Sequence, residues 1–75
     1  MLEIAICDDE PVMRKEISRH FSDYMAKRQD MDYRIRGFES GKQLLAWGHD
    51  FDLIFLDIQM EQPDGMETAR RLRQR

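Results

Sequence analysis

Three aspartates are the residues of this chain whose type and spacing suggest chemistry. Asp8 and Asp9 follow the apolar run "LEIAI" near the amino terminus, and Asp57 directly follows the apolar run "LIFL". An aspartate is expensive to bury and uncommon within strands, so a strand that ends on one needs an explanation. A positioned carboxylate can bind a hard cation, and it can also act as a nucleophile toward phosphorus. Both chemistries depend on where the surrounding elements place the side chains.

The apolar pattern predicts that strands and helices alternate along the whole chain. Strands are expected at Leu2–Ile6, at Tyr33–Phe38 and around Leu53–Leu56. The alternation of apolar residues with arginines in the second indicates one wet face, nearer a sheet edge than its centre. The unbroken apolar run of the third suits a strand covered on both faces. Strands alternating with helices form parallel sheets through right-handed crossovers, so the expected fold class is α/β, in the order βαβαβα.

The first helix is predicted to begin at Pro11, a residue that suits a first helical turn. Apolar residues then recur at spacings of three and four and predict one apolar face over about four turns. The residues of this face are Met13, Ile17, Phe21, Tyr24 and Met25. The opposite, basic face is expected to carry Arg14, Lys15, Arg19 and Lys27.

Two shorter helices are predicted further along the chain. Ser40 and Gln43 form a capping-box pattern before a helix that contains Leu44, Leu45 and Trp47 and ends near Gly48. After the turn "QMEQPDG", apolar residues mark one face of a last helix and arginines the other. These residues are Met66, Ala69 and Leu72 on the apolar face, and Arg70, Arg71 and Arg73 on the basic face.

Sites in open parallel sheets form beyond the carboxyl ends of the strands. If the first and third strands are neighbours, Asp8 and Asp9 meet Asp57 there, and three like charges need a cation. Oxygen-only ligands favour a hard cation such as Mg²⁺. We therefore predict Asp8 and Asp9 as metal ligands and Asp57 as a nucleophile that forms an aspartyl phosphate. The backbone carbonyl of Gln59 is a further predicted ligand.

Each of these acids also has a purely structural explanation. Acids before a helix are common caps, and Asp57 alone could be the point where a strand reaches water. Their occurrence together at matching ends of two parallel strands favours a site. Cys7 is predicted to fill core space, because neighbouring carboxylates disfavour its thiolate. His20 and His49 lack metal-like partners in the sequence and are predicted to lie at the surface.

The composition limits the classes of protein to consider. The chain has 75 residues, a formal net charge of −3 and 36% charged residues, which indicates one soluble domain and not a nucleic-acid binder with a basic face. Cys7 is the only cysteine, so a reducing, intracellular setting is favoured. The amino terminus does not resemble a signal peptide, and no apolar run approaches membrane-spanning length. We expect a cytoplasmic protein without a membrane partner.

The segments "ICDDE" and "LIFLDIQMEQPDGME" resemble the receiver (CheY-like) domain of bacterial two-component response regulators, and the resemblance covers residues 1–75. It implies a flavodoxin-like receiver fold with a three-stranded parallel sheet in the order 2-1-3. It also implies that Asp57 accepts a phosphoryl group from a sensor histidine kinase. Mg²⁺ would then be bound by Asp8, Asp9, Asp57 and the Gln59 carbonyl. One departure is Glu61, where the family usually has proline.

The resemblance also implies what this chain lacks. The family's unit has five strands and five helices, so the last two βα units are expected to be missing, with the serine or threonine that senses the phosphate and the lysine that pairs with it. We expect impaired phosphorylation in a truncated receiver domain, and self-association through the exposed third strand or third helix. DNA would be contacted only through an output domain outside this chain. The wording "FLDIQM" resembles transcription regulators with LytTR-type output domains.

Two other functions stay open. A Mg²⁺-dependent phosphohydrolase could use Asp57 as its nucleophile, but it usually needs a second acid two residues later, and that position is Gln59. Turnover as an enzyme is therefore not expected. The other open function is that of an interaction or dimerisation fragment with a vestigial site, which the short length of the chain favours.

Overall fold

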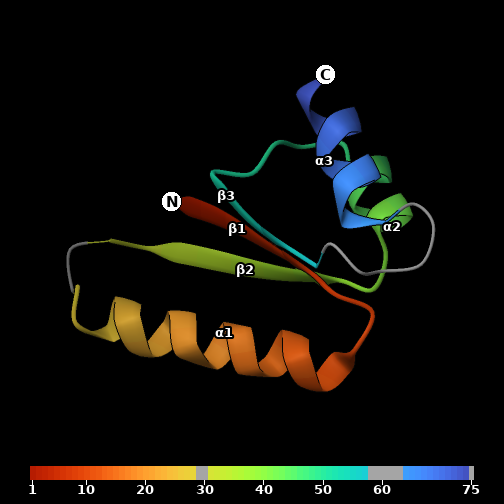
Figure 1. The fold of residues 1–75 in the computed structure, drawn as a ribbon. Helices are drawn as coiled ribbons and strands as arrows, with labels where there is room; N and C mark the ends of the chain where they lie inside the picture. Colours follow the sequence, from red (N-terminus) through yellow and green to blue (C-terminus); the bar gives the residue numbers. More distant parts are fainter. Residues whose placement is uncertain (29–30, 58–63, 75) are drawn as a thin grey trace.

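The computed structural model of the chain describes residues 1–28, 31–57 and 64–74. Strands and helices alternate in it, as predicted (Figure 1). The elements are β1 (Leu2–Cys7), α1 (Pro11–Ala26), β2 (Tyr33–Phe38), α2 (Gly41–Ala46), β3 (Leu53–Leu56) and α3 (Gly65–Arg73). None of the described helices is long and apolar enough to cross a bilayer.

The strands form one parallel sheet in the order β2-β1-β3. This result confirms the predicted α/β class and strand order, and it places the arginine-rich β2 at an edge. Cys7, the last residue of β1, is opposite Phe38 in β2 and Leu56 in β3. All three strands therefore end at the same level, and the residues that follow β1 and β3 start side by side.

The sheet lies between two helical layers. Figure 1 shows α1 along one face of the sheet, and α2 and α3 next to each other on the other face. Successive residues of β1 point to opposite faces, so Ala5 and Cys7 belong to the core under α2 and α3. That core contains the buried Ala5, Cys7, Phe38 and Leu44, with Trp47, Phe51, Ile54, Leu56 and Leu72 packed against them. Ile6 points to the opposite face, where it lines a pocket together with residues of α1 and β2.

The α1 layer is held to the sheet through aromatic contacts. The ring of Phe21 packs edge-on against Tyr33 of β2 at 5.7 Å and against Phe55 of β3 at 6.0 Å between centroids. Such edge-to-face pairs add to the free energy gained from apolar burial. A single helical residue therefore contacts both outer strands of the sheet, on either side of β1.

The faces of the helices differ in part from the prediction. Met13 and Tyr24 of α1 are exposed, whereas Arg14, predicted on the outer face, is half-buried. In α3, the prediction that Met66 points inward is wrong, because 66% of this residue is exposed. Thr68 is buried instead. The exact rotation of a helix about its axis depends on what it packs against, and the apolar period alone locates it only to about one residue.

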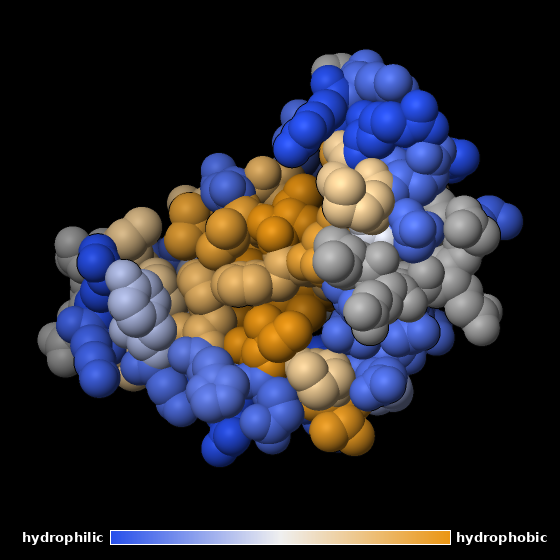
Figure 2. Space-filling model, viewed as in Figure 1, coloured by the Kyte–Doolittle hydropathy of each residue, from blue (hydrophilic) through white to orange (hydrophobic). Residues whose placement is uncertain are grey.

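The ends of α2 and the burial of β3 complete the comparison. The capping box before α2 is confirmed in its first half, since Ser40 Oγ accepts a hydrogen bond from the Gln43 N–H at 3.2 Å. Trp47 was predicted inside that helix but caps its carboxyl end. The apolar run of β3 suits burial on both faces, but the strand was expected to be exposed in this chain; Leu53 is indeed 41% exposed and the rest of the strand is half-buried. Figure 2 shows apolar side chains gathered over the sheet between α1 and α3.

Candidate functional site

Backbone hydrogen bonds extend the sheet by one residue beyond β1 and β3. The N–H of Asp8 donates to the carbonyl of Phe38, and the N–H of Asp57 donates to the carbonyl of Cys7, each at 3.0 Å. Asp8 and Asp57 therefore begin their loops from fixed backbone positions on neighbouring strands. A loop that starts in this way can place a side chain with the precision of the sheet.

The structure brings the three predicted aspartates together. One carboxylate oxygen from each of Asp8, Asp9 and Asp57 lies within 4.8 Å of the others. Asp8 is buried, Asp57 is half-buried and Asp9 is exposed. This convergence was predicted from the strand ends, and the structure has it. The roles assigned to the three residues remain predictions.

The donor set fits a hard divalent cation. Three carboxylates at this separation repel each other, and the burial of Asp8 strengthens that repulsion because water screens it less. All the donors are oxygens, and the exposed Asp9 side leaves space for water ligands, as Mg²⁺ prefers. The residues present therefore suit Mg²⁺ better than a softer metal.

Asp8 also has a structural role. Its Oδ1 accepts a hydrogen bond from the Glu10 N–H at 2.9 Å. Glu10 is the residue that caps α1, and its own side chain makes no capping hydrogen bond. The structural explanation for the acids before α1 is therefore correct for one oxygen of Asp8. It does not account for Asp57, which lies on a different strand.

Burial and charge keep Cys7 in its neutral form. The pKa of its thiol is raised from 9.0 to about 11, first by desolvation on burial and then by the negative charges of Asp8 and Asp57, while Arg14 opposes the shift. A thiol with such a pKa is protonated at neutral pH and is a poor nucleophile. The prediction that Cys7 fills core space is confirmed. Asp8 and Asp57 contribute to this raised pKa because their charges lie close to the end of β1.

Sequence reasoning missed Arg14. Its Nη1 donates a hydrogen bond to the backbone carbonyl of Asp8 at 2.7 Å, although the residue was assigned to the basic outer face of α1. One signal in the sequence could have found it. Arg14 lies seven residues before Phe21, and positions seven apart share a face of a helix. An arginine on an inward face needs an acceptor, and the loop after β1 supplies one.

The remaining predicted residues divide into two groups. Gln59 lies outside the described residues, so its carbonyl as a metal ligand stays a prediction. His20 and His49 are exposed, as predicted. His20 is 3.7 Å from a carboxylate oxygen of Glu16, and the ring of His49 packs edge-on against Trp47 at 6.2 Å. Neither histidine belongs to the aspartate cluster.

A parallel sheet covered by helices, with acidic side chains at the carboxyl ends of neighbouring strands, defines an open α/β domain whose site lies beyond those ends. Within this class the chain matches the response regulator receiver domain over residues 4–75. The chain belongs to the family of response regulator receiver domains.

Named relatives agree with this family. The chain is 36% identical over 74 residues to a probable histidine kinase 6 of Oryza sativa subsp. japonica, and 35% identical over 75 residues to histidine kinase 2 of Arabidopsis thaliana. It is 35% identical over 71 residues to an uncharacterized response regulatory protein of Vibrio cholerae. These matches cover 95%, 96% and 92% of this chain but only 7%, 6% and 26% of the three relatives. The chain therefore corresponds to a small part of each relative.

Proposed function

We propose that this chain is the phosphoacceptor module of a two-component signalling system, in which Asp57 accepts a phosphoryl group from a sensor histidine kinase in the presence of Mg²⁺. The observation that carries the proposal is the meeting of Asp8, Asp9 and Asp57 within 4.8 Å at the ends of neighbouring parallel strands. The family to which the chain belongs supports the same reading.

The proposed transfer needs only a few groups. A carboxylate oxygen of Asp57 forms a bond to phosphorus, while the bond from phosphorus to the imidazole nitrogen of the kinase breaks. The electron pair of that bond stays on the nitrogen. Protonation of the ring then leaves the histidine of the kinase as a neutral imidazole. Asp8, Asp9 and the Gln59 carbonyl would hold Mg²⁺, which neutralises charge on the transferring phosphoryl oxygens. The backbone hydrogen bond from Asp57 to Cys7 holds the nucleophile during the attack.

A small phosphodonor tests this function without the kinase. Because impaired phosphorylation is expected from the sequence, we expect only a fraction of the protein, incubated with acetyl phosphate and Mg²⁺, to gain the mass of one phosphoryl group, and fragmentation to locate that mass on Asp57. The Asp57→Asn variant should gain none. Asp23→Asn is the matched control, since Asp23 is exposed on α1 and lies outside the aspartate cluster. Labelling that persists in Asp57→Asn would overturn the assignment of the nucleophile.

The same assay separates the alternative functions. Continuous release of inorganic phosphate with regeneration of unmodified protein would support a phosphohydrolase. A chain that gains no mass with or without Mg²⁺ would support an interaction fragment with a vestigial site. A stable adduct supports the phosphoacceptor function, because the aspartyl phosphate then outlasts the transfer step.

Self-association is a second candidate function that a specific observation favours. Among the described residues, β3 pairs only with β1, so its outer edge presents unpaired backbone groups. Beside this edge lies a hollow of about 380 Å³, lined by Ile17, His20, Phe21 and Phe55. We propose a second copy of the chain as the occupant, because the same edge on two copies can pair with itself.

The proposal extends to the setting of the module. We propose that it acts in the cytoplasm, where kinases supply the phosphoryl group and a single cysteine stays reduced. Transcription regulation through a LytTR-type DNA-binding output domain is a further part of the proposal, and it rests on the wording "FLDIQM" alone. Reading the gene beyond the codon for Arg75 tests it directly. A continuation without a DNA-binding domain would remove this part.

A further inference from the structure

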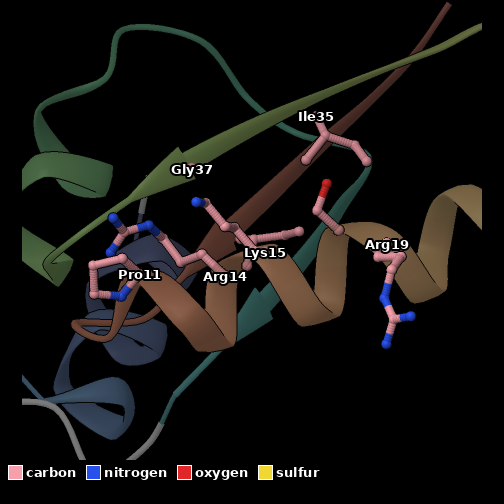
Figure 3. A pocket seen from close by; sticks show the side chains of 8 residues that line it. Pro11, Arg14, Lys15, Arg19, Ile35 and Gly37 are labelled. Atoms are coloured by element: carbon pink, nitrogen blue, oxygen red, sulfur yellow. The ribbon is translucent and has the colours of Figure 1, made fainter.

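Arg14 lies where α1, β2 and the loop after β1 meet. The residue is half-buried, and its Nη1 donates to the Asp8 carbonyl at 2.7 Å. Figure 3 shows its side chain extending beside Gly37 of β2, at one end of a hollow of about 450 Å³ between α1 and β2. The arginine therefore ties the helix to the loop that carries Asp8 and Asp9.

Gly37 leaves the space that this side chain occupies. A Cβ added to Gly37 would lie 3.4 Å from Cδ and 3.6 Å from Nε of Arg14, which is contact distance with no room beyond it. A glycine inside a strand weakens it, and it often marks a place where another group approaches the backbone closely. Alanine at this position would only touch the arginine, whereas the γ carbons of valine would take its place.

The Asp8 carbonyl belongs to the peptide unit that joins Asp8 to Asp9. Because this unit is planar, a hydrogen bond that fixes the carbonyl also fixes the direction in which Asp9 leaves. The N–H of Asp8 is bonded to Phe38 at 3.0 Å, and its Oδ1 accepts from Glu10 at 2.9 Å. Arg14 adds the contact that holds the following peptide.

We propose that Arg14 is a positioning residue for the aspartate cluster, that Gly37 makes its contact possible, and that this contact sets the affinity of Asp8 and Asp9 for Mg²⁺. The inference rests on the proposed function and adds a residue outside the aspartate cluster. Groups that orient metal ligands from behind affect metal affinity by about 10- to 100-fold when they are removed.

Charge and position can be separated on this helix. Lys15 is the neighbour of Arg14, carries the same charge and lines the same hollow. The structure gives it no hydrogen bond to the loop in the described part of the chain. Lys15→Gln therefore removes an equal charge without removing the contact, which makes it the matched control for Arg14→Gln.

The test is a Mg²⁺ titration of the 75-residue chain, followed through the amide NMR signals of Asp8, Asp9 and Asp57. We expect Arg14→Gln to weaken Mg²⁺ binding by about tenfold or more. Lys15→Gln should change the affinity by less than about twofold, because an exposed charge is screened. Arg14→Lys, which keeps one donor, should restore part of the loss.

Gly37 provides the second arm of this test. Gly37→Val should weaken Mg²⁺ binding as Arg14→Gln does, and Gly37→Ala should stay close to the wild type. The double variant Arg14→Gln, Gly37→Val should be no weaker than either single variant, because both remove the same contact. Losses that simply add would overturn the coupling of these residues.

A metal-free measurement separates this inference from the proposed function. Without Mg²⁺, Arg14→Gln should shift the Asp9 amide signal and speed its hydrogen exchange, while Lys15→Gln leaves both unchanged. A wild-type chain that binds no Mg²⁺ contradicts the proposed function, and the metal-free spectra still decide the role of Arg14. An unchanged Asp9 amide in Arg14→Gln, or equal losses of affinity in Arg14→Gln and Lys15→Gln, overturns the positioning role.

Discussion

Cys7 lies between the hydrophobic core and the aspartate cluster, because β1 passes from one to the other within a single residue. Its side chain packs in the buried core with Ala5, Phe38 and Leu44, and the next residue is Asp8. The raised pKa of the thiol follows from burial first and from the two carboxylates second. At the scale of the residue, the charges of the aspartate cluster therefore affect a buried side chain of the core.

This position of Cys7 predicts how stability depends on pH. The folded chain holds the thiol proton more tightly than the unfolded chain, since the pKa rises from 9.0 to about 11 on folding. The stabilisation is complete below pH 9 and is lost as the pH rises toward about 11. Its size is at most about 2 to 3 kcal/mol, because one pKa unit corresponds to about 1.4 kcal/mol.

Urea unfolding between pH 7 and 11, followed by Trp47 fluorescence, measures this effect against a Cys7→Ala variant. The variant is less stable overall because it leaves a cavity, so the shape of the curve is the quantity to compare. We expect the two curves to run parallel below pH 9 and to converge above it. Curves that stay parallel up to pH 11 would show that folding does not raise the pKa of the Cys7 thiol.

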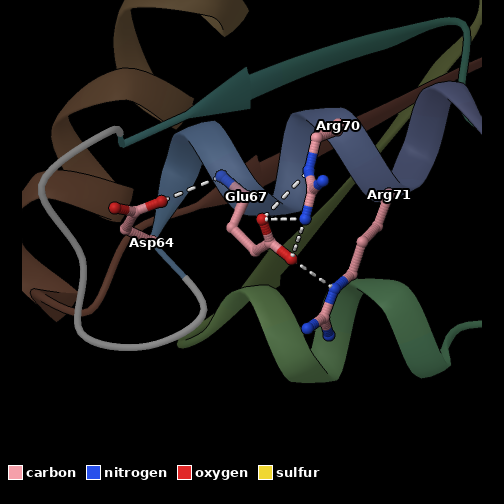
Figure 4. A network of polar contacts seen from close by, with 4 residues as sticks. All are labelled: Asp64, Glu67, Arg70 and Arg71. Atoms are coloured by element: carbon pink, nitrogen blue, oxygen red, sulfur yellow. Dashed lines mark hydrogen bonds and ion pairs between the residues drawn. The ribbon is translucent and has the colours of Figure 1, made fainter.

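At the scale of the element, α3 depends on its own polar contacts. Asp64 caps the helix, because its Oδ1 accepts from the Glu67 N–H at 2.8 Å (Figure 4). Glu67 in turn bonds to Arg70 at 2.6 Å and to Arg71 at 3.0 Å. These hydrogen bonds lower the pKa of Glu67 in the folded chain. Their contribution to the stability of the fold is small, because water screens it. It is present above the pKa of Glu67 in the unfolded chain and is lost as the pH falls through the lower pKa of the folded chain.

Removal of the cap should loosen α3. We expect Asp64→Ala to cost about 1 kcal/mol, because the N–H of Glu67 loses its acceptor and a nine-residue helix has little stability of its own. Asp64→Asn keeps an acceptor oxygen and should cost much less. Hydrogen exchange of the α3 amides and urea unfolding measure both effects. Equal stability of the alanine and asparagine variants would argue against the cap.

The comparison of sequence and structure also belongs to this scale. Strand and helix positions were predictable because alternation, Pro11 and the Ser40 cap are local signals. The convergence of the aspartates was predictable because parallel strands end at one edge of a sheet. The inward position of Arg14 and the outward position of Met66 were not, since each depends on how a helix rests on the sheet. Gly37 makes room for the arginine only in three dimensions.

At the scale of the whole molecule, the two faces of the sheet are unequal. One face carries the continuous core under α2 and α3, whereas the other is covered by α1 alone in the described part of the chain. The hollow lined by Ile17, Phe21 and Phe55 lies on the α1 side, and β3 is an edge strand of the sheet among the described residues. Because exposed apolar surface favours association, we expect a second copy of the chain to bind on this side of the sheet.

Self-association through β3 is therefore expected in solution. Light scattering over a range of micromolar concentrations should show a mass that rises from monomer toward dimer. Leu53→Lys, which places a charge on the strand at a position that is 41% exposed, should raise the dissociation constant by at least about tenfold, or about 1.4 kcal/mol. Val12→Lys is the matched control, since Val12 is 69% exposed and lies on α1 outside the hollow.

The two variants make this test specific to the edge of β3. Both replace an exposed apolar residue by lysine, so the change in net charge is the same and each variant loses apolar surface. Circular dichroism confirms that each variant keeps the fold before its mass is compared. Dimers that weaken equally in both variants would indicate a general charge effect, and a compact monomer in the wild type at every concentration would remove the proposed interface. A dimer lost only in Leu53→Lys identifies the unpaired edge of β3 as the surface where two copies meet.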